Sequence, residues 1–260
     1  MMSEDYLRLR TVRKTFTTPT GPLPVLDGVD ATVGRGQFIA MIGPSGCGKS
    51  TLFNVLTGLE TPDAGRVEVA GADITGTVGH CAYMPQRDLL MPWRTIVDNT
   101  VLGLDVQGVP RAAARRRAAA LFDQFGLAGF ENAYPADLSG GMRQRAALLR
   151  TVVQDKQIVA LDEPFGALDS LTRTDLQGWL QDVWQRHDWT VLMITHDIRE
   201  AIYLADRVLV LSPRPARIIR DLAVPLPRPR ELRLLTAPEF VALEAQLLDL
   251  LHTPSRGRSE

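Results

Sequence analysis

The feature that most constrains this chain is a glycine-rich segment directly after a run of five apolar residues, Phe38–Ile42. A continuous apolar run of this length is typical of a strand that is buried on both faces. Residues 50–56, after the segment, have a helical pattern. The sequence therefore predicts a strand, a tight loop and a helix, an order found in α/β folds. The loop reads Gly43, Pro44, Ser45, Gly46, Cys47, Gly48, Lys49, Ser50, Thr51 and fits the pattern G-x-x-x-x-G-K-S.

This loop is suited to binding the phosphate groups of a nucleotide. Glycine has no Cβ, so backbone N–H groups can turn inward around phosphate oxygens. The N-terminus of the following helix attracts the same anion. Lys49 is expected to place its charge on the β- and γ-phosphates, and the Ser50 hydroxyl to bind Mg²⁺. We interpret Cys47 as a small passive residue of the loop rather than a reactive thiol.

Two adjacent acids, Asp162 and Glu163, follow a second apolar run at residues 158–161. Side chains alternate along a strand, so the two carboxylates should point in different directions. We expect Asp162 to support Mg²⁺ and Glu163 to act as general base towards an attacking water. The alternative is a strand end that simply reaches solvent, but the phosphate-binding loop upstream favours the chemical role.

The remaining pattern predicts a mainly parallel α/β sheet. Apolar runs at residues 191–194 and 208–211 are separated by helical stretches. Residues 7–10 and 29–33 alternate between apolar and polar, which predicts a small antiparallel element. Gly21, Pro22 and Pro24 are expected to break the chain between these two strands.

The middle and the end of the chain have other patterns. Strand patterns are absent between residues 86 and 150, and residues 110–122 are rich in Ala, Arg and Leu, which predicts an inserted helical block. Prolines after residue 211 predict an extended connector. Residues 237–251 have the spacing of a terminal helix, and residues 253–260 are expected to be frayed.

Charge and composition exclude several classes of protein. The formal net charge is −1, so nucleic acid is not expected as a main partner. The sequence has no apolar run long enough to span a bilayer and no signal peptide at its start, so we expect a cytosolic protein. Cys47 and Cys81 lack the spacing of a disulfide framework or a zinc site, so we expect two reduced thiols. No asparagine is followed by lysine, which counts against a GTPase with an N-K-x-D motif.

One further segment resembles a known family. Leu138-Ser139-Gly140-Gly141-Met142-Arg143-Gln144-Arg145 is similar to the signature sequence of ABC-transporter ATPases, with Met142 where the family usually has Gln. The order of motifs is also similar: phosphate-binding loop, Gln86, signature, Asp162-Glu163, the turn Ala167-Leu168-Asp169, and His196. Ser139 is a favourable N-cap for a helix at residues 142–149, whose N-terminus is a second potential anion site.

The resemblance, which runs from about Leu7 to Arg220, implies a P-loop ATPase of ABC type. It implies one domain over residues 1–260. Residues 1–86 and 151–222 would form the nucleotide-binding core, residues 87–150 a helical subdomain, and residues 223–260 a C-terminal extension.

The implied ligands are ATP and Mg²⁺, with Ser50, Gln86 and Asp162 near the metal. Gln86 would also contact the attacking water, and His196 the γ-phosphate. Phe16 would stack on adenine, although a core phenylalanine remains the alternative. Ser139, Gly140 and Gly141 of one subunit would close over ATP held by a second copy of the chain, with Asp169 at the seam between them.

Residues 90–95, 165–169 and 211–215 resemble the importer ATPases for nitrate, sulfonate and taurine, a group that also serves thiamine precursors. This implies an integral membrane permease, an external solute-binding protein, and a peripheral place on the cytoplasmic face of the membrane. Leu89, Leu90, Met91 and Trp93 would form the groove for a permease helix, or alternatively fill the core of the helical block.

The chain also ends before the large regulatory domain that sugar-importer ATPases carry. The rival class is a soluble ABC-type ATPase that acts as a mechanical clamp. Such proteins usually have two cassettes, long coiled coils or basic arms, and the sequence shows none of these. No residue identifies the solute.

Overall fold

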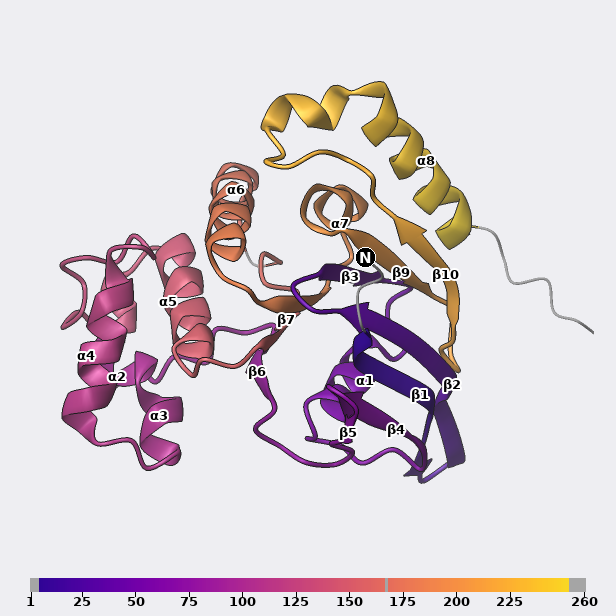
Figure 1. The fold of residues 1–260 in the computed structure, drawn as a ribbon, viewed down its shortest axis with the longest axis horizontal. Coiled ribbons are helices and arrows are strands. Elements are labelled where there is room, and N and C mark those ends of the chain that lie inside the picture. The colour runs from indigo at the N-terminus through magenta and orange to yellow at the C-terminus, as the bar shows by residue number, and fades with distance from the viewer. Residues whose placement is uncertain (1–4, 167, 253–260) are drawn as a thin grey trace, which may run out of the picture.

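The computed structural model describes residues 5–166 and 168–252, which form two sheets with helices around them (Figure 1). The larger sheet has the order β10-β9-β3-β8-β7-β6. Its strands are β3 (Phe38–Ile42), β6 (Cys81–Met84), β7 (Ile158–Asp162), β8 (Thr190–Ile194), β9 (Arg207–Leu211) and β10 (Ile218–Ala223). All pairs are parallel except β10 with β9. Every residue of β3, β7 and β8 is buried, which confirms the predicted parallel sheet.

The smaller, antiparallel sheet has the order β2-β1-β4-β5. It contains β1 (Asp5–Thr18), β2 (Gly21–Gly34), β4 (Ala64–Val69) and β5 (Ala72–Asp73). The predicted antiparallel element is confirmed, but the predicted break was wrong, because Gly21, Pro22 and Pro24 pair with β1. β2 lies at the edge of this sheet, where proline is tolerated because one side of the strand needs no ladder donors.

Two strands of the larger sheet were not predicted. β6 has only four residues, two of them buried, so its pattern is too short to recognise. β10 lies in the segment that was expected to be only a connector. As an edge strand it buries Leu222 and leaves most of its other residues exposed, so its sequence lacks an apolar run.

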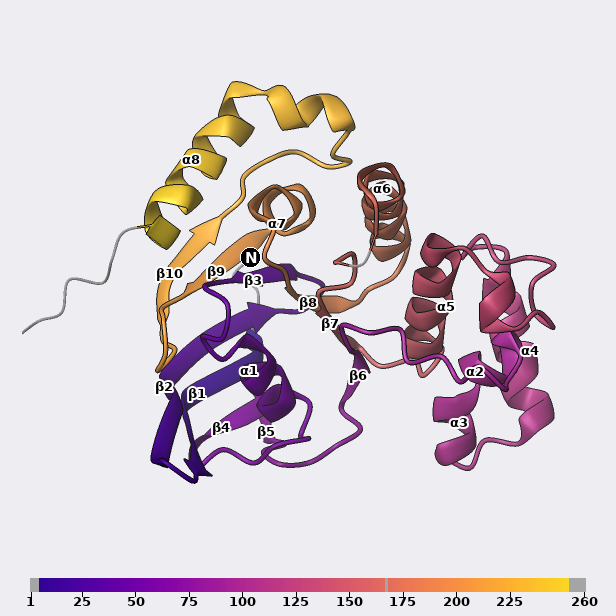
Figure 2. The same ribbon diagram turned by 180° about the vertical axis from the view of Figure 1, so that it is seen from behind.

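Residues 87–150, all of them described, contain helices and no strand, as predicted. The elements are α2 (Ile96–Thr100), α3 (Leu102–Val106), α4 (Arg111–Phe122), the short 3₁₀ helix η1 (Pro135–Asp137) and α5 (Gly140–Val152). This block lies at one end of the molecule, beyond β6 and β7, in both views (Figures 1 and 2).

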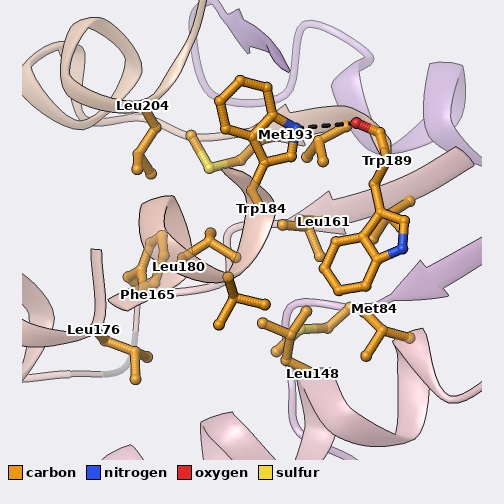
Figure 3. Close-up of a cluster of buried hydrophobic side chains, with 14 of the residues drawn as sticks. Met84, Leu148, Leu161, Phe165, Leu176, Leu180, Trp184, Trp189, Met193 and Leu204 are labelled. Carbon is orange, nitrogen blue, oxygen red and sulfur yellow. Dashed lines mark hydrogen bonds between the residues drawn. The ribbon is translucent and has the colours of Figure 1, made fainter. Parts of the chain in front are cut away.

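Helix α5 rests on the sheet through a continuous apolar cluster (Figure 3). Leu148 of α5 lies with Met84 of β6 and with Leu176 and Trp184 of α6 (Ser170–Arg186). The indole N–H of Trp184 donates to the carbonyl of Trp189, 3.0 Å away, so this large ring is buried without an unpaired donor. The helical block is therefore packed directly against the sheet.

The terminal helix α8 (Pro238–His252) confirms the predicted helix at residues 237–251. It follows the 3₁₀ helix η2 (Leu232–Thr236) and packs on α7 (Ile198–Leu204), with Phe240 and Leu247 fully buried. Residues 253–260, for which fraying was predicted, and Ala167 of the predicted turn lie outside the described residues. Among the described helices, none combines the length and the apolar character needed to cross a membrane.

Arg230 fastens the segment before α8 to the core. Its guanidinium is buried and donates to the carbonyls of Ile202 (2.7 Å), Ala205 (2.7 Å) and Val224 (3.2 Å). Burial lowers the pKa of Arg230 to about 10, so it stays charged at neutral pH. The free carbonyls at the end of α7 thus obtain a charged donor in place of solvent.

We expect Arg230→Ala to lower the free energy of unfolding by about 3 kcal/mol, because several buried carbonyls lose their donor. Urea denaturation of the two proteins measures this difference. Arg233→Ala is the matched control, since the Arg233 side chain is 84% exposed and should change stability by about 0.5 kcal/mol at most. Equal denaturation midpoints for Arg230→Ala and the control would show that the hydrogen bonds of Arg230 do not stabilise the fold.

Candidate functional site

A cavity of about 390 Å³ opens at the N-terminus of α1 (Lys49–Leu56). Phe16, Val25, Glu163 and Arg214 form its walls. Gly43, Pro44 and Cys47 do not line it, and Cys47 is 2% exposed within the apolar core. Three of the nine residues predicted for the phosphate-binding loop thus lie outside the lining of the cavity. The other six line the cavity: Ser45, Gly46, Gly48, Lys49, Ser50 and Thr51.

The N-terminus of α1 is prepared for an anion. Its N-cap is Gly48, with φ at +124°, which has no side chain to accept from the first N–H groups of the helix. The first turn also contains no acidic residue. The Lys49 ammonium donates to the carbonyls of Gly43 (2.8 Å) and Pro44 (3.1 Å), which places its positive charge under the loop. Free N–H groups, a helix N-terminus and a lysine together favour a phosphate group.

Three predicted catalytic residues meet beside this cavity. Glu163, Gln86 and His196 follow β7, β6 and β8, whose carboxyl ends lie at one edge of the parallel sheet. The Gln86 side-chain amide donates to Glu163 Oε2 at 2.8 Å, and His196 Nδ1 lies 3.4 Å from the same oxygen. The structure therefore brings these three residues together, although they are far apart in the sequence.

The backbone of Glu163 is in an uncommon conformation. Its φ is +46°, in the left-handed region that residues other than glycine rarely adopt. The N–H of Glu163 donates to the carbonyl of Ile194 at 2.9 Å, which fixes this conformation against β8. Strain of this kind persists where the surrounding structure imposes it, and it is concentrated at functional sites.

The residues expected near Mg²⁺ supply suitable ligand atoms. Asp162 is 6% exposed, and its burial raises the pKa of the carboxyl, while a hydrogen bond from the Ser50 hydroxyl opposes this shift. The Tyr83 hydroxyl donates to Asp162 Oδ2 at 3.4 Å, and burial raises the pKa of Tyr83 to about 12, so this donor stays protonated. A hydroxyl, a carboxylate and the amide oxygen of Gln86 are oxygen ligands, which fit a hard cation such as Mg²⁺.

The predicted signature residues form a separate group. Ser139 is the N-cap of α5, as predicted, and its Oγ accepts from the N–H of Met142 at 3.3 Å. A Cβ on Gly141 would lie 2.7 Å from Thr172 Cγ2, so the start of α5 contacts the start of α6 closely. Asp169 caps α6 by accepting from the N–H of Thr172 at 3.1 Å, and this bond lowers the pKa of Asp169. Neither Ser139, Gly140, Gly141 nor Asp169 lines the cavity beside α1.

Phe16 lies where a nucleotide base could contact it. It is half-buried within β1, and it lines the cavity. The Lys14 ammonium is 5.3 Å from the centre of its ring. Because Phe16 also packs on the core of the smaller sheet, its position fits both interpretations from the sequence.

The apolar residues after Gln86 divide into two groups. Leu90 is 8% exposed and belongs to the apolar core, so the core interpretation is right for this residue. Leu89 and Trp93 are 52% and 72% exposed, and Met91 is half-buried. Two large apolar side chains near Gln86 are therefore available to a partner.

The sequence analysis missed Glu200, which lies behind His196. Glu200 is 5% exposed and accepts from the Gln177 amide of α6 at 3.0 Å. The N–H of Glu200 donates to Asp197 Oδ1 at 3.1 Å, and the N–H of Asp197 donates to the Thr195 hydroxyl at 3.0 Å. These bonds enclose the turn that carries His196. The spacing D-x-x-E at the start of a helix is a capping pattern that could have identified Glu200.

Comparisons with known proteins agree with these features. The sequence model of the family described as ABC transporter matches residues 26–166. The chain is 44% identical over 243 residues to the aliphatic sulfonates import ATP-binding protein 1 of Agrobacterium fabrum, covering 93% of this chain and 82% of that protein. It is 43% identical over 202 residues to the formylaminopyrimidine import ATP-binding protein of Halalkalibacterium halodurans, covering 78% and 79%.

Two solved structures of an ABC cassette are also similar. A dimeric structure of a bacterial ABC transporter cassette has a TM-score of 0.73 and 28% identity, and the match covers 84% of this chain and 98% of the other. A dimeric post-hydrolysis state of an ATP-binding cassette with ADP and phosphate has a TM-score of 0.72 and 27% identity, with the same coverage. The fold class expected from the sequence is thus confirmed.

Glu200 should make the stability of the folded protein depend on pH. Burial is the main cause that raises the pKa of Glu200 from its ordinary 4.5 to about 7. Because the folded-state pKa is the higher one, the ionised carboxylate destabilises the folded protein. This contribution to stability is most favourable below pH 4.5 and is lost as the pH rises through 7.

We therefore expect the stability of the natural protein relative to Glu200→Gln to fall by about 3 kcal/mol between pH 4.5 and pH 8. Urea denaturation of both proteins at several pH values measures this difference. Asp175→Asn, at an exposed residue of α6, is the control to which the pH dependence of Glu200→Gln is compared. A difference between Glu200→Gln and the natural protein that does not change with pH would show that Glu200 has an ordinary pKa.

Proposed function

The chain belongs to the ABC transporter family, and from that premise we propose that it is the ATP-binding and ATP-hydrolysing subunit of an importer for a small solute. The observation that carries this proposal is the contact of Gln86 and His196 with Glu163 at the edge of a cavity lined by Lys49 and Ser50. Anion-binding groups and a candidate general base thus share one site.

In the proposed mechanism, the loop N–H groups and Lys49 bind the phosphates of ATP. Glu163 accepts a proton from the attacking water, and Gln86 and His196 hold its carboxylate in place. Ser50, Asp162 and Gln86 would hold Mg²⁺. When bound, Mg²⁺ supplies positive charge that stabilises the phosphate oxygens. Phe16, which also lines the cavity, would stack on adenine.

We propose that two copies of the chain are needed for a complete site. Ser139, Gly140, Gly141 and Asp169 form a group that does not line the cavity of its own chain. Ser139 stands at the N-terminus of α5, which attracts anions. In the proposed dimer, this group of one copy closes over ATP bound to the other. The dimeric cassette structures to which the chain is similar support this arrangement.

The importer assignment rests on relatives and on one exposed surface. Two similar proteins are named as import ATP-binding proteins, for aliphatic sulfonates and formylaminopyrimidine, which favours an importer over a soluble clamp. Leu89 and Trp93, in the helical subdomain of residues 87–150, would contact a membrane permease. The protein would then lie on the cytoplasmic face of the membrane and serve an external solute-binding protein. Residues 1–86 and 151–222 would form the catalytic core, and residues 223–260 its extension.

We expect Glu163→Gln to bind ATP but to hydrolyse it at least about 100-fold more slowly, because the amide cannot accept the proton. The variant should also accumulate as a dimer with Mg²⁺ and ATP, since closure is no longer followed by hydrolysis. A phosphate-release assay and size-exclusion chromatography measure the two effects.

Lys49→Ala tests the phosphate-binding loop. We expect its ATP affinity to fall about 10- to 100-fold, because the loop loses its charged donor. Unchanged hydrolysis in Glu163→Gln would refute the assignment of Glu163 as the base. Unchanged ATP affinity in Lys49→Ala would refute the assignment of the phosphate-binding loop.

The docking surface is tested separately by Trp93→Asp, which places a charge on a side chain that is 72% exposed. We expect this variant to lose co-purification with its membrane permease, because the charge would have to be buried without a partner. Val106→Asp is the control, since Val106 of α3 is also exposed, at 83%. Equal recovery of the permease with both variants would contradict the assigned surface.

A further inference from the structure

Arg214 connects a distant turn to the phosphate-binding loop. It lies between β9 and β10, and its Nε and Nη2 donate to the carbonyl of Gly46 at 3.1 Å and 2.6 Å. The two residues are 168 positions apart in the sequence. Arg214 also forms part of the cavity wall. The same segment resembles importer ATPases in sequence, but the proposed mechanism gives it no role.

The turn that carries Arg214 is fixed to the smaller sheet. The N–H of Ala216 donates to the carbonyl of Val25 at 2.8 Å, and the N–H of Asp27 donates to the carbonyl of Ala216 at 3.1 Å. Arg217 also forms an ion pair with Asp27 of β2, but its side chain is 63% exposed, so this pair adds little to the restraint. Ala216 is fully buried. Arg214 is thus an exposed side chain on a turn that is bonded to β2 two residues further along the chain.

A loop whose N–H groups face an anion directs carbonyls away from it, and those carbonyls need donors of their own. Lys49 supplies donors to Gly43 and Pro44, and the N–H of Cys47 donates to Pro44 at 3.2 Å. Within the described part of the chain, the hydrogen bonds found to the Gly46 carbonyl come from Arg214.

Such a restraint has an effect at Gly46. Its φ is +72°, and glycine can leave this conformation easily because it has no Cβ. Rotation of the peptide after Gly46 would break both bonds to the guanidinium. The planar fork of arginine therefore restricts a peptide that glycine alone leaves free.

We propose that Arg214 is a positioning residue of the phosphate-binding loop: its guanidinium holds the Gly46 peptide, so that the loop is organised before the phosphates arrive. The proposal rests on the proposed function, because it concerns the same nucleotide site. It adds a residue that does not itself contact the phosphates. Pre-organisation of a loop strengthens binding because less conformational freedom is lost when the ligand binds.

The test compares ATP with inorganic pyrophosphate, which offers phosphates without a base or ribose. Isothermal titration calorimetry is performed on the natural protein, Arg214→Ala, Arg214→Lys and the control Arg217→Ala. We expect Arg214→Ala to weaken both ligands by the same factor, about five- to tenfold. Arg214→Lys should lie between, because lysine keeps a donor but loses the fork. Arg217→Ala removes a charge from the same turn and should bind both ligands as the natural protein does.

Several results would overturn the proposal. Weaker ATP binding with unchanged pyrophosphate binding would mean that Arg214 contacts the nucleoside instead. A difference between natural protein and Arg214→Ala that disappears in about 1 M KCl would mean that Arg214 acts only through its charge, because salt screens exposed charges. Unchanged affinity for both ligands would show that Arg214 does not organise the phosphate-binding loop. If the natural protein binds neither ligand, the proposed function itself fails, and this result is distinct from the others.

Discussion

The site depends on backbone N–H groups at the start of α1, where the N-cap Gly48 has no side chain to accept from them. Such donors are satisfied by an anion, and Lys49, buried beneath the loop, adds a full positive charge to their partial charges. β3 fixes this loop because it lies between β8 and β9 in the centre of the sheet. The neighbouring strands β6, β7 and β8 then end at the same edge and deliver Gln86, Glu163 and His196. The order of the strands thus decides which side chains can act on a bound phosphate.

The residues around Glu163 and the group at the starts of α5 and α6 are joined through helices rather than through a shared cavity. Glu200 on α7 braces the turn of His196 and binds Gln177 on α6. Helix α6 begins at its cap, Asp169, where Gly141 of α5 approaches Thr172 closely. Contacts through α7 and α6 thus link the turn of His196 to the start of α5.

The sequence predicted those parts of the fold and site that local patterns determine. The fully buried strands were visible as apolar runs, the phosphate-binding loop as a motif, and Ser139 as an N-cap. Features that depend on distant contacts were missed. Pro22 and Pro24 were taken for a break because nothing local shows that β2 is an edge strand. Arg214 was unrecognised as a neighbour of Gly46 because 168 residues separate them, and Leu89 and Leu90 differ in burial although they are adjacent and identical.

The central claim is that phosphate groups, held by the loop and Lys49, provide most of the nucleotide affinity. Isothermal titration calorimetry with AMP, ADP and ATP in the presence of Mg²⁺ tests it most directly. We expect ADP and ATP to bind, and AMP, which lacks the β-phosphate, to bind at least about 100-fold more weakly. Comparable affinities for AMP and ADP would show instead that the base and ribose supply the binding energy.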